Sequence, residues 1–172
     1  MSKTYLNWKI KKTKLDKVIQ IIPSEFKDYR GSYIEIYNKE FLVKNKINVN
    51  FIQDDVSISK KNVLRGIHGD RQTWKLVSCL FGKFQLIVVN NDQKSPQYKK
   101  WESFILSSKN RLQILIPPKF GNGHLVLSKK TIFHYKQNSQ YDRKSQFTIK
   151  WNDPVFKFKW KQKNPILSAR DK

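Results

Sequence analysis

Short runs in which apolar and polar residues alternate make up most of the chain. Alternation with a period of two is typical of strands that bury one face. Segments rich in Gly, Asn and Pro, such as 90–96 and 117–123, separate the runs and supply turn chemistry. The pattern predicts strands at 18–22, 32–36, 48–54, 62–67, 74–80, 84–89, 101–106, 113–116, 124–127, 131–136 and 148–151.

Helices contribute little to this pattern. The chain holds a single alanine, Ala169, and residues 37–44 are the one segment that reads as a short helix. About ten short strands at close spacing favour an all-β sandwich, jelly roll or barrel. No linker or internal repeat divides the sequence, so we expect one domain over 1–172, long enough to bury its own core.

The charge of +22 is typical of a nucleic-acid-binding protein. However, the chain has 29 Lys and only 6 Arg, and the lysines are spread along its whole length. Arginine is the residue that reads bases and clamps phosphates. An excess of Lys, Ile and Asn with almost no Ala is what an AT-rich coding sequence produces. We therefore expect solvated surface lysines, no nucleic-acid partner, and a general attraction for anionic ligands.

Several other classes are disfavoured. No apolar run approaches the roughly 18 residues of a membrane span, and no signal-peptide pattern is present, so we expect a soluble, cytoplasmic protein. A single cysteine, Cys79, excludes an internal disulfide and a Cys-cluster zinc site. His68, His124 and His134 lack metal-ligand spacing, so we expect no metal. Phosphate-loop, dinucleotide and nucleophile-elbow motifs are missing as well.

Polar residues on otherwise apolar strands are the candidates for chemistry, because a β-barrel holds a ligand in its mouth. They are Arg65 and His68 near the end of one strand, Lys75 at the start of the next, Asn122 and His124 on one face, Tyr135, and Asp153 in the turn "WNDP". Taken singly, each has an ordinary structural role: strand-end histidines are solvated, tyrosines pack in sheets, and an Asp before Pro forms a turn. These residues alone indicate a β-barrel with a polar mouth.

Taken together, the motifs are more specific than the single residues. "VLRGIH", "KLV", "SPQYKKW", "IPPKFGNGHLVLS", "FHYK", "WNDP" and "PILSARD" occur in an order that resembles the dTDP-4-dehydrorhamnose 3,5-epimerase family. Upstream, "YRGSYIEIYN" and "FIQDDVSIS" are similar to that family's "RG-F-E" and "QDN-S-S" segments. The resemblance covers residues 27–172.

This resemblance implies a cupin-type jelly roll and a homodimer that exchanges N-terminal strands. It also implies a nucleoside-diphosphate 4-keto-6-deoxy sugar as substrate. The ketone acidifies the protons at C3 and C5, so a base can remove one and an acid can return a proton to the opposite face. That chemistry needs no cofactor.

The resemblance also implies roles for individual residues. His68 matches the general base, Asp153 its partner, Tyr135 the acid and Lys75 the cation near the enolate oxygen. Residues that match positions for holding the diphosphate, sugar or nucleotide, partly across the dimer, are Arg65, Arg30, Tyr33, Glu35 and Gln53.

The chain departs from the family pattern in two places. The segment "HGDRQTWKLV" is about three residues shorter than usual and carries Trp74, which we expect to alter the sugar pocket beside the base. Asn122 stands where the family usually has His, with His124 two residues on. "RGIHGD" followed by "TWKLV" is similar to a subgroup acting on GDP-4-keto-6-deoxy-heptose in capsule assembly. The sequence therefore favours a GDP-heptose substrate.

Four alternatives stay open at this point. The same chemistry could act on dTDP-4-keto-6-deoxyglucose, or the enzyme could epimerise C3 or C5 alone. A basic nucleic-acid-binding barrel would need Arg and aromatic residues interleaved on one sheet face, whereas the six Arg are scattered along the chain. A cupin that binds the sugar nucleotide without epimerising it would not need His68 and Tyr135 to reach the pocket.

Overall fold

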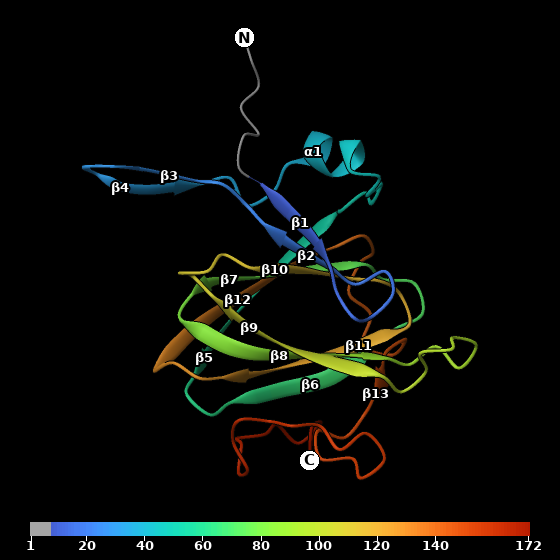
Figure 1. The fold of residues 1–172 in the computed structure, drawn as a ribbon. Helices are drawn as coiled ribbons and strands as arrows, with labels where there is room; N and C mark the ends of the chain where they lie inside the picture. The colour runs from blue at the N-terminus through green and yellow to red at the C-terminus, as the bar shows by residue number, and fades with distance from the viewer. Residues whose placement is uncertain (1–7) are drawn as a thin grey trace.

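Two antiparallel sheets packed face to face form the body of the protein (Figure 1). The computed structural model describes residues 8–172. One sheet has the order β1 (Lys9–Lys12), β2 (Ile19–Ile22), β10 (Gln113–Ile116), β7 (Lys75–Phe81), β12 (Lys130–Gln137), β5 (Gln53–Lys60). The other has the order β13 (Phe147–Thr148), β6 (Leu64–Gly69), β11 (Phe120–Val126), β8 (Lys83–Asn90), β9 (Trp101–Ser107).

The path of the chain between these sheets is that of a jelly roll. β5, β7, β10 and β12 lie in one sheet, and β6, β8, β9 and β11 lie in the other. Most connections therefore cross from sheet to sheet, which covers both inner faces without a closed barrel. The predicted fold class is confirmed.

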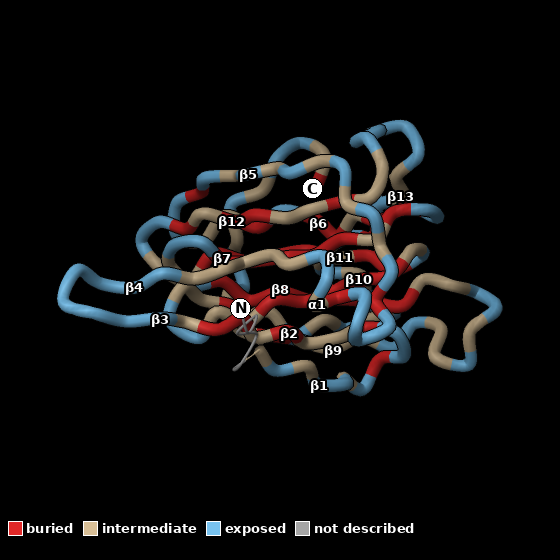
Figure 2. Tube along the Cα trace, turned by 90° about the horizontal axis from the view of Figure 1, so that it is seen from above, coloured by how far each residue is buried: buried red, intermediate tan, exposed pale blue. Residues whose placement is uncertain are grey.

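Large apolar side chains fill the space between the sheets, and Figure 2 shows the buried residues along the inner strands. Val77, Phe84, Leu86 and Ile114 are fully buried in this main cluster. A second cluster lies under the helix, and a third lies where the C-terminal segment covers β6 and β8. The apolar filling leaves one region between the sheets to polar groups, and that region holds the site described below.

The helix α1 (Lys39–Lys44) is short and caps the second cluster through Leu42. Asn38 Oδ1 accepts a hydrogen bond from the backbone N–H of Phe41, a typical N-cap. The helix therefore begins two residues later than predicted. Among residues 8–172, no helix has the length and apolar character needed to cross a membrane.

Most predicted strands are confirmed with end shifts of a few residues, but the one at 48–54 is wrong. β5 begins only at Gln53, and its polar residues face inward while Val56 and Ile58 are exposed. The prediction assumed that alternation places apolar residues on the inner face. On β5 the polar residues lie on the inner face and the apolar residues on the outer face. Strand β1 and strand β3 (Glu25–Asp28) were not predicted.

A hairpin of β3 and β4 (Gly31–Ile34) projects from the body like an arm (Figure 1). Tyr29 is 97% exposed at its tip and Tyr33 is 70% exposed on its second strand. Arg111 donates a hydrogen bond to Glu25 and ties the base of the arm to the body. The arm thus leaves large aromatic side chains in contact with solvent.

Gly66 allows β6 and β11 to approach closely at the site. Its φ is +109°, a conformation that L-residues with a side chain avoid. A Cβ there would lie 2.6 Å from Gly123 Cα and 2.7 Å from Asn122 O. Both neighbours are backbone atoms and cannot turn away.

We predict that Gly66→Ala lowers the free energy of unfolding more than Gly31→Ala does. Both positions have positive φ, so both variants carry backbone strain of about 1–3 kcal/mol. Only Gly66→Ala adds a steric clash, since nothing lies within 4 Å of the Cβ at Gly31. Urea unfolding of the two variants measures the difference. Equal losses would mean that the close approach of β6 and β11 is not required.

Candidate active site

A cavity of about 500 Å³ lies between the two sheets, where the apolar core ends. It brings together six residues predicted from the sequence: Arg65, His68, Lys75, Asn122, His124 and Tyr135. His68 and Asn122 come from β6 and β11 of one sheet, whereas Lys75 and Tyr135 come from β7 and β12 of the other. A ligand in the cavity would therefore have functional groups on both sides.

His68 is paired with a carboxylate from the end of the chain. Its Nε2 lies 2.8 Å from Asp171 Oδ1. The two groups form an ion pair whenever the imidazole carries a second proton. Burial alone would raise the pKa of Asp171, but His68 and Ser168 outweigh it, so the pKa is lowered. Asp171 is thus an anion that lies against the imidazole and fixes its orientation.

Pairing of the C-terminal segment with the start of β6 places Asp171. Ile166 forms a parallel bridge with Val63, donates to Asn62 O at 2.8 Å and accepts from Leu64 N at 3.0 Å. The chain then turns, with Ser168 Oγ donating to Asp171 Oδ2 at 2.8 Å. These hydrogen bonds hold residues 168–171 at the cavity.

Asp153 was predicted as the partner of His68, and the structure corrects this. Its Oδ1 accepts a hydrogen bond from Val155 N at 2.8 Å within its own turn. It lines a different cavity, with Trp151 and Trp160. The motif "WNDP" is therefore a turn, whereas Asp171 of "PILSARD" supplies the carboxylate.

Tyr135 faces His68 from the opposite sheet. Asp55 is its cross-strand partner on β5, held by Gln53, whose amide donates to both carboxylate oxygens at 3.0 and 2.8 Å. Burial first, and then the Asp55 carboxylate, raise the pKa of Tyr135 above its ordinary value. The phenol therefore stays protonated and can act as a proton donor.

Lys75 is the buried cation of the site. Its exposure is 8%, and its Nζ lies 5.9 Å from the centre of the Tyr135 ring. Burial lowers the pKa of Lys75, and Arg170 lowers it further, whereas Asp70 and Asp55 raise it. An ammonium group in this setting stabilises negative charge that develops nearby.

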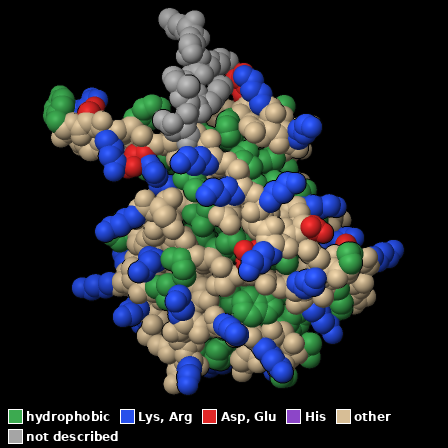
Figure 3. Space-filling model, viewed as in Figure 1, with side chains coloured by type: hydrophobic (Ala, Val, Ile, Leu, Met, Phe, Trp, Pro, Cys, Tyr) green, Lys and Arg blue, Asp and Glu red, His purple; other side chains and the backbone are tan. Residues whose placement is uncertain are grey.

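Cationic side chains dominate the cavity wall. Arg65, Arg143 and Arg170 line it with Lys75, while Asp171 is the one carboxylate among the described lining residues. Half of the six arginines thus gather here, although they are scattered in sequence. Figure 3 shows Lys and Arg side chains, coloured alike, spread over one face of the molecule. This cavity suits a ligand with phosphate groups.

Two neutral polar residues complete the wall on β11. Asn122 lies opposite His68 and His124 lies opposite Arg65, with a break in the strand register between them. His124 is fully buried in the cavity wall, and burial is the main reason that its pKa falls to about 3. Both side chains were predicted to bind substrate, and both reach the cavity.

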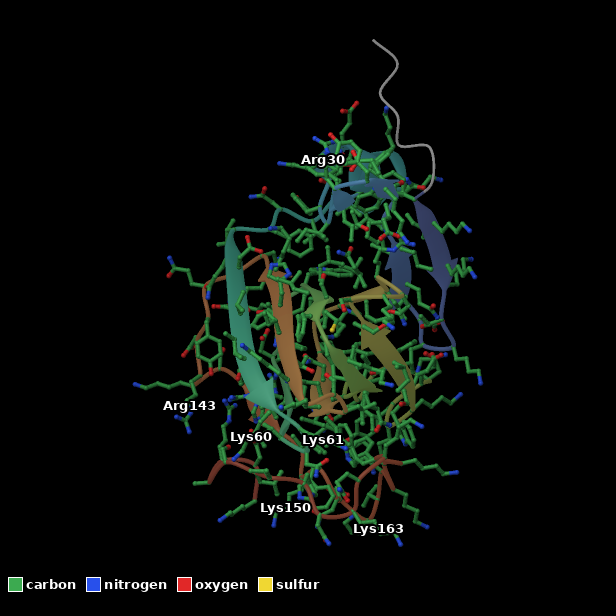
Figure 4. The ribbon with its side chains drawn as sticks, turned by 90° about the vertical axis from the view of Figure 1, so that its left-hand side faces the viewer. Arg30, Lys60, Lys61, Arg143, Lys150 and Lys163 are labelled. Atoms are coloured by element: carbon green, nitrogen blue, oxygen red, sulfur yellow. The ribbon has the colours of Figure 1, made fainter. Side chains whose placement is uncertain are left out.

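The other predicted binding residues do not line it. Tyr33 lies on the arm, Arg30 in the turn that precedes β4, and Glu35 just after the arm, where it accepts from Asn38 Nδ2 at 2.9 Å. Figure 4 shows Arg30 near the top of the molecule, far from Arg143 beside the cavity. Gln53 is absent from the lining, but its Oε1 accepts at 2.9 Å from the backbone N–H of Tyr141, which lines the cavity. Arg30, Tyr33 and Glu35 therefore do not reach the cavity of their own chain.

The short segment between His68 and Lys75 is absent from the lining of the cavity. None of residues 69–74 is among its lining residues. Asp70 Oδ1 accepts from the backbone N–H groups of Gln72 and Thr73, which folds the segment tightly, and Trp74 packs into the cluster under α1. The segment therefore adds no side chain to the cavity wall, and the expectation of an altered sugar pocket beside the base stays a prediction.

Several lining residues were not singled out from the sequence. They are Ser57, Phe133, Tyr141, Arg143, Gln146, Ser168, Ala169, Arg170 and Asp171. The motifs "FIQDDVSIS" and "PILSARD" contain five of them. The sequence therefore marked these segments, but it did not show that these side chains lie at the cavity. Within residues 8–172, no three His, Cys, Asp or Glu side chains are grouped as a metal site.

Comparison with known proteins gives a consistent result. A model of the dTDP-4-dehydrorhamnose 3,5-epimerase family matches residues 12–172. The dTDP-4-dehydrorhamnose 3,5-epimerase of Salmonella typhimurium is 38% identical over 167 residues, 93% of this chain and 90% of that protein.

Two solved structures share the fold. The dTDP-6-deoxy-D-glucose-3,5-epimerase of Legionella pneumophila, in complex with dTDP-4-keto-L-rhamnose, is 34% identical with a TM-score of 0.92, covering 96% of this chain and 90% of that one. The Bacillus anthracis dTDP-4-dehydrorhamnose 3,5-epimerase, with TDP and PPi bound, is 31% identical with a TM-score of 0.92, covering 96% and 97%. The chain therefore belongs to the dTDP-4-dehydrorhamnose 3,5-epimerase family.

Proposed function

We propose that this epimerase inverts C3 and C5 of dTDP-4-keto-6-deoxyglucose. One observation carries the proposal: the His68–Asp171 pair and Tyr135 come from opposite sheets and line one cavity. Epimerisation needs a proton removed from one face of the sugar and returned to the other. A base and an acid on opposite walls meet that need.

His68 acts as the base in this proposal. The ring nitrogen that does not face Asp171 takes the proton from the carbon next to the ketone. The C–H electron pair becomes the enolate double bond, and negative charge moves to the ketone oxygen. Asp171 stabilises the imidazolium that forms, because the two groups are then oppositely charged at 2.8 Å.

Lys75 and Tyr135 complete the cycle. The buried ammonium of Lys75 stabilises the enolate oxygen, since Coulomb attraction is stronger away from water. The Tyr135 hydroxyl then donates its proton to the carbon from the other face, which inverts the centre. Exchange with solvent returns the tyrosinate and the imidazolium to their starting forms.

The choice of dTDP rests on the relatives and the arginines. The relatives described above carry dTDP in their names, and the Legionella enzyme was solved with a dTDP sugar. We assign Arg65 and Arg170 to the diphosphate because both line the cavity; Arg65 Nε donates to Ser59 Oγ at 3.1 Å, and Arg170 donates to Gln146 Oε1 at 3.0 Å. The GDP-heptose expectation finds no support in these comparisons.

A homodimer would complete the nucleotide site. Val56 and Ile58 on the outer face of β5 are 56% and 58% exposed, and the arm projects on the same side of the molecule (Figures 1 and 4). A second copy seated on this face would cover the apolar row and receive the arm. Arg30, Tyr33 and Glu35 would then serve the partner's cavity, since they do not reach their own.

We predict that His68→Asn and Asp171→Asn both lower kcat, by about 10²–10⁴-fold for His68, because a positioned acid–base group contributes that much. Asp153→Asn serves as the matched control and keeps near-normal kcat, since its carboxylate caps a remote turn. Steady-state kinetics with dTDP-4-keto-6-deoxyglucose give the three values. A large loss in Asp153→Asn with normal turnover in Asp171→Asn would reverse the assignment.

We predict that Tyr135→Phe separates proton removal from inversion. His68 still exchanges the proton at C3 or C5 with solvent, but no group returns a proton from the other face. In deuterated water, NMR should therefore show label entering faster than the inverted sugar forms. Inversion at the wild-type rate would mean that another donor supplies the proton.

We predict that Ile58→Glu shifts the protein from dimer to monomer, because it places charge in the apolar row that the second copy covers. Loss of the partner's arm should also weaken dTDP binding. Light scattering measures the mass and calorimetry the affinity. Lys94→Glu, an exposed change far from β5, is the control. A wild-type monomer, or a dimer insensitive to Ile58→Glu, would contradict the shared site.

A further inference from the structure

His124 carries a polar atom into a part of the cavity wall that is otherwise aromatic. Its ring stacks flat on Phe133, with 4.0 Å between centroids and an interplanar angle of 9°, and lies 5.4 Å from Phe84. The side chain is 4% exposed. A phenyl ring could make the same stack, so packing does not explain an imidazole here.

The imidazole nitrogen Nε2 is buried and has no hydrogen-bond partner in the protein. A buried polar atom without a partner destabilises the fold. Because the residue lines the cavity, a bound ligand is the natural source of the missing hydrogen bond. Asn122, two residues before on β11, has an unpartnered Oδ1 and lines the same wall.

The charge state of His124 indicates which kind of ligand group can form this hydrogen bond. Burial, Arg65 and His68 all lower its pKa, which falls to about 3, whereas Asp171 raises it. The ring is therefore neutral near pH 7, with one nitrogen that donates and one that accepts. A neutral group with both capacities suits a hydroxyl, while the cavity's arginines suit the phosphates.

We infer that His124 is a specificity-determining residue that hydrogen-bonds a hydroxyl of the substrate's sugar ring, at C2 or C3. The inference rests on the proposed function, because the sugar must lie between His68 and Tyr135. His124 shares β11 with Asn122, which is the cross-strand partner of His68, so its polar atom lies on the wall of the base. A site that hydrogen-bonds a hydroxyl rejects the deoxy analogue, since its own polar group then stays unpaired.

The test compares dTDP-4-keto-6-deoxyglucose with its 2-deoxy and 3-deoxy analogues. NMR follows proton exchange at C3 and C5 in deuterated water and gives kcat/KM for each. We expect the wild type to prefer the full sugar over one analogue by at least about tenfold. His124→Phe should remove most of that preference and leave the affinity for dTDP alone unchanged. His124→Gln, which keeps a donor and an acceptor, should retain part of it.

Ser78→Ala is the matched control. Ser78 is also buried with an unpartnered hydroxyl, but it lies on β7 outside the cavity lining, so its loss should leave the preference intact. The inference would be overturned if His124→Phe kept the wild-type preference for the full sugar over both analogues. If the wild type exchanges no proton in any of the sugars, the proposed function fails. The ratio of dissociation constants for the same sugars then decides the role of His124.

Discussion

The pairing of the last residues of the chain with the start of β6 is the constraint on which the site depends. It sets the Asp171 carboxylate 2.8 Å from His68, and without it the histidine would face the cavity with no counter-charge. A carboxylate beside an imidazole fixes the orientation of the ring. The two jelly-roll sheets then supply the other groups at fixed positions, with Tyr135 and Lys75 on the wall opposite His68.

The same architecture explains why β5 is inverted. A sheet normally turns its apolar residues inward, but the inner face of β5 carries Gln53, Asp55 and Ser57 next to the cavity. Its outer face carries Val56 and Ile58, and exposure of these apolar side chains to water is unfavourable. The proposed ligand on one side and the proposed second copy on the other would account for both features. The inverted strand thus links the catalytic cavity to the proposed dimer.

Sequence patterns located most strands and six of the cavity residues, because those signals are local: period-two alternation, turn residues and motifs around His68 and Tyr135. They failed where the answer depends on long-range pairing. Asp153 and Asp171 both lie in motifs near the C-terminus, and only the bridge from Ile166 to Val63 decides which one meets His68. The sequence also does not predict that one cavity is lined by Arg65, Arg143 and Arg170, because more than a hundred residues separate the first from the last.

The measurement that tests this account most directly is the position of deuterium after the wild-type protein acts on dTDP-4-keto-6-deoxyglucose in deuterated water. One base, one acid and a single 4-ketone predict label at both C3 and C5, with inversion at both carbons. The corresponding GDP-linked 4-keto-6-deoxy sugar should gain label far more slowly. Absence of label from the dTDP sugar, or faster labelling of the GDP sugar, would contradict the account.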